Sequence, residues 1–237
     1  MTDVPLAQRN IVALGGGGFL GEASPALDDY LLRLTGKPRP KVCFIPTASA
    51  DSESTVVRFY RTFHADRCRA TDLSLFHRTV DNIREFLFEQ DLIYVGGGNT
   101  ASMLAVWRAH GVSEVLRDAW AAGIVLGGVS AGGICWFEGG VTDSFGSGLA
   151  ALHDGLGILK GTFCPHYSSE TNRRPTYRRL VAEGFPGGYA ADDGVGLHFV
   201  GTDLAAVVAS RPEVKAHRVE ARDGSVAETP LEPIRLT

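Results

Sequence analysis

The chain has 237 residues, of which 44% are hydrophobic and 21% are charged, and its formal net charge is −4. This composition is ordinary for a globular protein, and the length suits one large domain, so we expect a single domain over residues 1–237. A mildly acidic chain gives no electrostatic reason to expect nucleic acid or an anionic membrane as partner. No apolar run reaches the roughly 20 residues that a membrane-spanning helix needs. The four cysteines form no Cys-x-x-Cys pair and the N-terminus has no basic-then-apolar leader, which together predict a cytoplasmic protein with free thiols.

The first half of the sequence alternates apolar strands with helical patterns. We expect strands at residues 10–14, 41–45, 70–76 and 91–95. We expect helices at residues 24–34, 54–65, 100–110 and 112–122. Continuous apolar strands separated by helices are typical of a parallel sheet covered on both faces. The sequence therefore predicts an α/β fold with a mostly parallel sheet flanked by helices.

The pattern changes after residue 140. Residues 139–148 form a polar, glycine-rich stretch that predicts a loop. Short strand-like segments joined by turns follow at 188–191, 195–200, 204–210 and 215–221. Short strands with turns between them favour an antiparallel extension at the C-terminal end of the fold.

A glycine-rich turn follows the apolar segment at 123–126. It reads Gly128-Val129-Ser130-Ala131-Gly132, the Gly-x-Ser-x-Gly pattern of a nucleophile elbow. Small neighbours are needed there because the serine backbone is strained and the strand and the next helix approach closely. We expect helical residues at 134–138, with Ser130 projecting from the carboxyl edge of the sheet. The amide of Ala131 can then face an oxyanion.

A serine hydroxyl is a poor nucleophile, so a base must take its proton and a third group must orient that base. His166 ends a short strand at a proline-defined turn, which is where catalytic residues at a sheet edge lie. Asp192 and Asp193 end another strand, and alternation along that strand directs only one of them toward His166. Asp143, in the polar loop, is the competing carboxylate.

Three segments, in this order, resemble the dipeptidase E family of serine peptidases. They are Tyr94-Val95-Gly96-Gly97-Gly98-Asn99-Thr100, the turn around Ser130, and Cys164-Pro165-His166-Tyr167. The family also contains cyanophycinase, and its flavodoxin-like fold resembles that of class I glutamine amidotransferases, with serine in place of cysteine. The resemblance covers residues 40–200.

The resemblance implies a role for each matching residue. Ser130 would be the nucleophile and His166 the base, while Gly98 and Ala131 would supply the amides of the oxyanion hole. It favours Asp193 as the third member of the triad, because relatives carry an acidic residue, often glutamate, before a glycine at that position. An acidic residue after the serine matches Asp143, which stays the second choice.

The resemblance also bears on the substrate. Dipeptidase E cleaves dipeptides with an N-terminal aspartate and holds that side chain with an arginine shortly after the histidine. Arg174 is the first candidate for this contact here and Arg173 the second, since a guanidinium binds a carboxylate in a bidentate fork. The alternative is that both belong to a solvated helix face. Cys164 and the loop at 143–148 depart from dipeptidase E, so the sequence predicts amide hydrolysis more firmly than aspartate specificity.

Two other enzyme classes have partial motifs. Gly16-x-Gly18-x-x-Gly21 matches a dinucleotide-binding fingerprint, but the second strand ends in Phe44-Ile45-Pro46-Thr47 without the acidic residue that would hold the ribose. An α/β-hydrolase order would need Asp192 or Asp203 with His198 or His217.

The sequence predicts a cytoplasmic exopeptidase that acts on short peptides through Ser130, His166 and Asp193. We find no metal-ligand spacing and no Walker lysine, and we expect neither a metal nor a cofactor. A small peptide is the expected partner, and a homodimer is left open. A cyanophycinase-like hydrolase of another acidic amide, or a non-catalytic amidotransferase-like binding module, are the alternatives.

Overall fold

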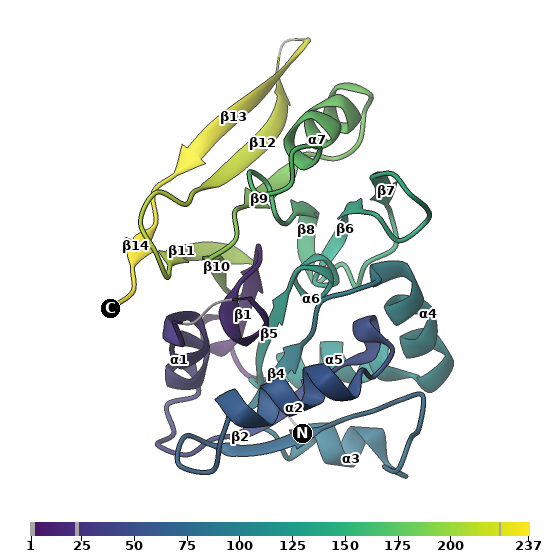
Figure 1. The fold of residues 1–237 in the computed structure, drawn as a ribbon, viewed down its shortest axis with the longest axis vertical. Helices are drawn as coiled ribbons and strands as arrows, with labels where there is room; N and C mark the ends of the chain where they lie inside the picture. Colours follow the sequence, from purple (N-terminus) through teal and green to yellow (C-terminus); the bar gives the residue numbers. More distant parts are fainter. Residues whose placement is uncertain (1–2, 22–23, 223) are drawn as a thin grey trace.

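The computed structural model describes residues 3–21, 24–222 and 224–237, and a parallel sheet forms its centre (Figure 1). Within these residues the larger sheet has eight strands, in the order β14-β11-β10-β1-β5-β4-β2-β3. The parallel members are β1 (Asn10–Leu14), β2 (Lys41–Ile45), β3 (Arg69–Asp72), β4 (Leu92–Val95) and β5 (Val125–Val129). The predicted α/β class with a mostly parallel sheet is confirmed.

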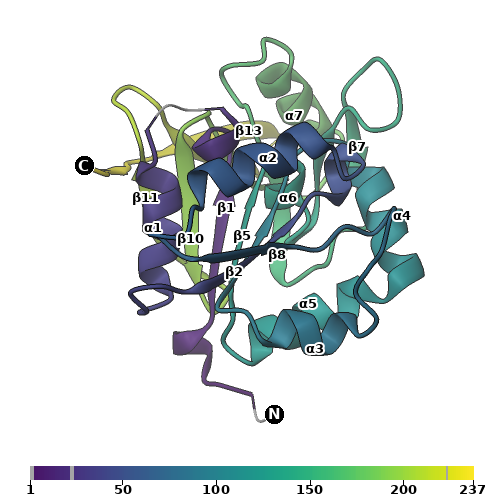
Figure 2. The same ribbon diagram turned by 60° about the horizontal axis from the view of Figure 1, so that its bottom comes forward.

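Helices cover both faces of this sheet because its strands are apolar on both sides. The helices are α1 (Ala26–Leu34), α2 (Glu53–Thr62), α3 (Ile83–Phe88), α4 (Thr100–His110) and α5 (Val112–Ala121). Val12 and Leu14 of β1 pack in one core cluster with residues of α1 and α2, while Ile11 and Ala13 pack in the opposite cluster with residues of α3, α4 and α5. Figure 2 shows α2 and α3 on opposite sides of β2. Short 3-10 turns occupy Leu6–Gln8, Gly18–Leu20 and Thr47–Ser49.

The C-terminal half is only partly the predicted extension. The strand β10 (Val195–Val200) does add antiparallel to β1, and β11 (Asp203–Ala209) adds antiparallel to β10. At the edge, β14 (Ile234–Arg235) pairs parallel with β11. The other strands form a second sheet, which the sequence did not predict. Its order is β13-β12-β9-β8-β6-β7, and α7 (Arg173–Ala182) packs on it. Its strands are β6 (Phe137–Thr142), β7 (Ala150–Leu152), β8 (Leu159–Cys164), β9 (Gly188–Ala191), β12 (Ala216–Arg222) and β13 (Ser225–Leu231).

The predicted helix at 134–138 and the loop expected to start at residue 139 are wrong. Helix α6 covers only Ala131–Ile134, and β6 begins at Phe137. The glycines that suggest a loop serve close packing of strands: a Cβ on Gly139 would collide with the carbonyl of Leu152, and one on Gly140 with that of Phe163. Glycine in a strand often marks such a close backbone approach.

Other element boundaries differ by a few residues from the predictions. Helix α1 starts at Ala26 instead of residue 24, and α2 ends at Thr62 instead of 65. Strand β3 ends at Asp72, and β5 is shifted toward the serine, ending at Val129. None of the described helices has the length and apolar character needed to cross a membrane.

Candidate active site

Ser130 lies in a strained turn between β5 and α6. Its backbone has φ +56° and ψ −112°, a conformation rare for a residue with a side chain. A Cβ on Gly128 would collide with the carbonyl of Gly132, and a Cβ on Gly132 with the carbonyl of Val95. Both glycines of the Gly-x-Ser-x-Gly pattern are therefore required by close backbone contact.

Ser130, His166 and Asp193 are joined by hydrogen bonds. His166 Nε2 lies 2.8 Å from Ser130 Oγ, and His166 Nδ1 lies 2.6 Å from Asp193 Oδ1. The side chains of His166 and Asp193 are 21% and 31% exposed, so solvent reaches this pair. His166 follows β8 of the second sheet, and Asp193 lies in the turn between β9 of that sheet and β10 of the main sheet. The three side chains thus meet where the two sheets meet.

Three consecutive carbonyls at the end of β1 hold the backbone of these segments. Leu14 O accepts from the amide of Ser130 at 3.0 Å, and Gly15 O accepts from the amide of His166 at 3.1 Å. Gly16 O accepts from the amide of Gly194, next to Asp193, at 3.0 Å.

Gly16 also provides the space that the His166–Asp193 pair fills. A Cβ at Gly16 would overlap Asp193 Oδ1 and would lie 2.9 Å from His166 Cε1. From the sequence alone, the glycine cluster after the first strand predicts a tight turn or a dinucleotide-binding motif. Sequence reasoning therefore missed that this cluster packs against the candidate site.

The surroundings of Asp193 favour its ionised form. Burial alone raises the pKa of this carboxyl, but the hydrogen bond and charge of His166, the Ser169 hydroxyl and the positive charge of Arg211 outweigh it and lower the pKa. Arg211 also donates to the backbone carbonyl of Asp193 at 2.9 Å. An ionised carboxylate accepts from His166 Nδ1–H and leaves Nε2 as the acceptor facing Ser130.

Two backbone amides flank Ser130 without a partner. Within the described part of the chain, the amides of Gly98 and Ala131 donate to no other protein group. The loop of Gly98 lies against the serine, since a Cβ on Gly97 would be 3.3 Å from Ser130 Cβ. Gly98 has φ +137°, and a Cβ there would collide with the carbonyl of Ala48. Free amides beside a nucleophile are the donors that an oxyanion requires.

The competing acidic residue Asp192 has a structural use. Its carboxylate accepts from the amides of Ser168 at 3.0 Å and Lys215 at 2.8 Å, and it does not reach His166. Asp143 lies in the wall of a cavity instead of beside His166.

One of the two histidines of the α/β-hydrolase alternative is engaged elsewhere. His198 is buried between the Tyr30 hydroxyl, at 2.8 Å, and Asn10 Oδ1, at 2.9 Å.

The two arginines considered for the substrate contact each have a partner within the protein. Arg173 is 4% exposed and donates to Glu170 at 2.6 Å and to the carbonyl of Val141 at 2.8 Å. Arg174 lies 2.7 Å from a carboxylate oxygen of Glu228, on the second sheet. Both guanidinium groups are thus bound by the protein, because α7 turns these side chains toward neighbouring strands and loops.

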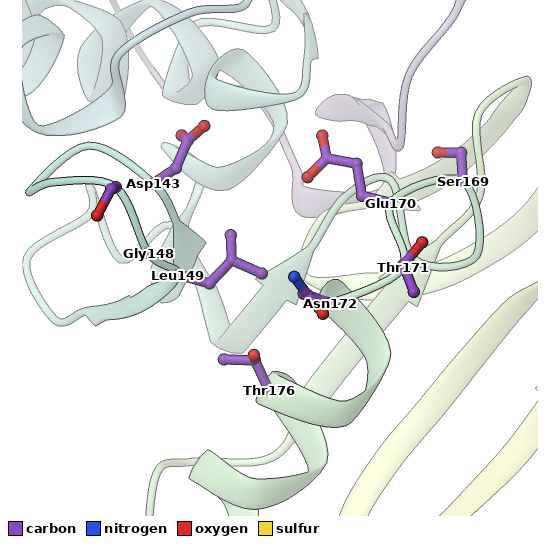
Figure 3. Close-up of a pocket in the computed structure, with 9 residues that line it drawn as sticks. Asp143, Gly148, Leu149, Ser169, Glu170, Thr171, Asn172 and Thr176 are labelled. Atoms are coloured by element: carbon purple, nitrogen blue, oxygen red, sulfur yellow. The ribbon is translucent and has the colours of Figure 1, made fainter.

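A cavity of about 580 Å³ lies between the loop at 143–149 and the segment 169–176 (Figure 3). Its lining includes Ser169, whose side chain hydrogen-bonds Asp193. One wall is the loop at 143–149, whose Ser144 carbonyl accepts from Asn99 Nδ2 at 3.2 Å, directly after Gly98. The other wall starts at Ser169, three residues after His166. Asp143 and Glu170 lie on opposite walls, and the lining includes no lysine or arginine. Among the described residues, no group of three or more His, Cys, Asp or Glu is arranged to hold a metal ion.

The chain is similar in sequence to known peptidases. Residues 11–207 match the family model of peptidase family S51. The chain is 47% identical over 225 residues to the uncharacterized peptidase YgaJ of Bacillus subtilis, which covers 94% of this chain and 97% of that protein. It is 29% identical over 171 residues to an uncharacterized peptidase of Listeria innocua, covering 67% of this chain and 78% of the relative.

Two solved structures share the fold at 20% sequence identity. A peptidase from an acI-B1 Actinobacterium superposes with a TM-score of 0.72, covering 95% of this chain and 94% of that one. A putative peptidase E protein from Listeria monocytogenes EGD-e superposes with a TM-score of 0.62, covering 86% and 98%. The fold and the sequence matches define a peptidase of the mixed α/β class. The chain belongs to peptidase family S51, the family of dipeptidase E, as the sequence motifs predicted.

We expect Gly16→Ala to break the hydrogen bond between His166 and Asp193, because the new methyl group would occupy the position of the carboxylate. The imidazole N–H proton shared with a carboxylate gives a far-downfield proton NMR signal, which should be present in the wild type and absent in this variant. Gly146→Ala is the matched control, since a Cβ there meets no atom within 4 Å. A signal retained in Gly16→Ala would contradict the packing described.

The lowered pKa of Asp193 predicts a pH-dependent contribution to stability. A carboxyl whose pKa is lower in the folded state stabilises the fold above its unfolded pKa of about 4, and this contribution is lost as the pH falls through the folded value. The difference in free energy of unfolding between wild type and Asp193→Asn should therefore shrink below about pH 4. Urea unfolding at a series of pH values measures it, and a difference that grows with acidity would refute the assignment.

Proposed function

We propose that this protein is a serine-type exopeptidase that cleaves short peptides, with Ser130, His166 and Asp193 as its catalytic triad. The observation that carries the proposal is the continuous hydrogen-bonded row of these three side chains, at 2.8 Å and 2.6 Å, beside a strained serine. The membership of family S51 supports peptide hydrolysis, and the geometry supports the serine mechanism.

The reaction would begin with Ser130 Oγ attacking the scissile carbonyl carbon. His166 Nε2 takes the serine proton, while Asp193 accepts from Nδ1–H and stabilises the imidazolium that forms. The carbonyl oxygen becomes an oxyanion, which the amides of Gly98 and Ala131 stabilise; each such donor contributes about 3–4 kcal/mol to the transition state.

The intermediate then collapses. The C–N bond breaks, and His166 gives its proton to the leaving amine. Water, deprotonated by His166, then attacks the acyl group on Ser130 and releases the second product, which restores the serine hydroxyl.

The peptide would bind in the cavity between the loop at 143–149 and the segment 169–176. Its volume of about 580 Å³ lies in the range of small-ligand sites and suits a peptide of a few residues. Asp143 can attract the positively charged N-terminus of a peptide, and such a contact would fix the position of the chain end relative to Ser130. Glu170 on the opposite wall is already paired with Arg173. An aspartate side chain finds no guanidinium there, so this structure favours a peptidase that does not require N-terminal aspartate.

A fluorophosphonate should label the wild type at Ser130, and Ser130→Ala should abolish the label. His166→Ala should slow labelling by about 10²- to 10⁴-fold, because the hydroxyl loses its base. Mass spectrometry of the labelled peptide and the rate of label uptake measure this. His64→Ala, at an exposed histidine whose ring nitrogen lies 3.6 Å from Asp66, is the control and should label at the wild-type rate. A wild type that takes up no label would favour the binding module, and equal labelling of wild type and Ser130→Ala would refute Ser130 as the nucleophile.

A panel of dipeptides with different N-terminal residues tests the substrate class. We expect kcat/KM for N-terminal aspartate to be no higher than for N-terminal alanine, since Asp143 lines the cavity and no lysine or arginine does. Arg174→Ala should leave the ratio of kcat/KM for the aspartate dipeptide to kcat/KM for the alanine dipeptide unchanged, even if both values fall. A preference for aspartate that disappears in Arg174→Ala would restore the arginine contact predicted from the sequence.

A further inference from the structure

Tyr167 connects the candidate base to the interior of the protein. It directly follows His166, whose backbone has φ +54°, and its own side chain is fully buried. Its amide donates to the carbonyl of Ala191 at 3.1 Å. A residue at positive φ keeps that conformation only where neighbouring contacts fix it, so the anchoring of Tyr167 bears on the placement of the imidazole.

The far end of Tyr167 reaches the hairpin of β12 and β13. Its ring centroid lies 5.4 Å from that of His217 on β12 and 5.8 Å below the guanidinium of Arg174. The hydroxyl oxygen is buried and has no hydrogen bond of good geometry within the described part of the chain. Burial and the charge of Glu228 raise the pKa of Tyr167, so the hydroxyl keeps its proton and acts as a donor.

Glu228 of β13 supplies the acceptor at this point. Its side chain is only 6% exposed, and it is paired with Arg174 at 2.7 Å and with Arg178. Oε2, the oxygen 2.7 Å from Arg174, is buried, and among the described residues neither it nor the Tyr167 hydroxyl has a hydrogen bond of good geometry. Arg174 contacts both the carboxylate and the tyrosine ring, so Glu228 and Tyr167 lie beside the same guanidinium, and the charge of Glu228 acts directly on Tyr167.

The burial of the Glu228 carboxylate has an energetic cost that its contacts must offset. A buried charge is costly unless it is paired and hydrogen-bonded, and a buried hydroxyl without a partner costs about 1–3 kcal/mol. Arg174 and Arg178 compensate the charge of Glu228, and a hydrogen bond from Tyr167 to Oε2 would supply the acceptor that the hydroxyl lacks. The hairpin that carries Glu228 lies beyond residues 11–207, the part of the chain that matches the family model.

We propose that Glu228 is a positioning residue: it accepts a hydrogen bond from the Tyr167 hydroxyl and thereby holds His166 in its strained, productive conformation. This inference rests on the proposed function, because it concerns the base of that reaction. The C-terminal hairpin would then be part of the catalytic machinery, although it contributes no group that touches the substrate.

The test compares variants that remove the acceptor, remove the donor, or keep both. Glu228→Leu and Tyr167→Phe should each slow fluorophosphonate labelling of Ser130 by about tenfold, because a shift of the base by a fraction of an ångström weakens proton transfer. Peptide cleavage should show the same loss in kcat with KM unchanged. Glu228→Gln should keep most of the rate, since its amide oxygen still accepts from the hydroxyl. The double variant Tyr167→Phe/Glu228→Leu should be no slower than Glu228→Leu, because both changes break one bond.

Glu183→Leu is the matched control. Glu183 pairs with Arg179 on the same helix as Arg174, at 2.7 Å, but both side chains are exposed. This variant should label at the wild-type rate.

Urea unfolding separates positioning from stability. If Glu228→Leu and Tyr167→Phe are less stable but label as fast as the wild type, Glu228 only stabilises the fold and the inference is refuted. If Glu228→Leu does not fold, the labelling rate of Tyr167→Phe alone tests the inference, because this variant keeps the buried ring and removes only the hydroxyl. A wild type that is not labelled at all would refute the proposed function and this inference with it, whereas a labelled wild type with unaffected variants refutes the inference alone.

Discussion

The arrangement of the candidate site depends on the backbone carbonyl groups of Leu14, Gly15 and Gly16. They accept in turn from the amides of Ser130, His166 and Gly194, so one short stretch after β1 fixes three segments that are far apart in the sequence. Backbone at positive φ costs on the order of 1–3 kcal/mol at a residue with a side chain, and two of these three segments contain such a residue. The strain is sustained because each amide has one rigid acceptor at the end of a buried central strand.

This arrangement also explains why two sheets are needed. Ser130 follows a strand of the main sheet, His166 follows a strand of the second sheet, and Asp193 lies on the connection between them. Phe137 and Phe163 of the second sheet stack at 5.3 Å, and Phe137 meets Phe199 of the main sheet at 5.7 Å, which fixes the two sheets against each other. The packing of these phenylalanines between the two sheets therefore sets the positions of Ser130, His166 and Asp193 relative to one another.

The sequence predicted those parts of the structure that local pattern determines. Strands such as Asn10–Leu14 and Val195–Val200 have the boundaries expected from their apolar runs, and the serine turn was recognisable because close packing restricts its neighbours to glycine and alanine. His166 was recognisable from its place after a strand and from the family motif. Its hydrogen bonds to Ser130 and Asp193 required the structure, since they join residues that are 36 and 27 positions away.

Other features depend on contacts that no local pattern records. Gly139 and Gly140 look like loop residues until the neighbouring strands are in place. Arg174 looks like a substrate ligand by its distance from the histidine, but its partner Glu228 is 54 residues further along the chain (228 − 174). The second sheet was missed for the same reason, because its strands come from both sides of α7 and pair out of chain order.

The loop at 143–149 has a consequence for how such a protein can change over time. It joins β6 to β7 at the edge of the second sheet, and its backbone takes no part in the row of carbonyls at the end of β1. Insertions, deletions and substitutions in this loop can therefore reshape one wall of the cavity while the serine, the histidine and the carboxylate stay where they are. Selection can therefore act on substrate specificity and on the hydrolytic chemistry as two nearly independent traits. Proteins of this fold can share the same chemistry and differ in the substrates that they accept.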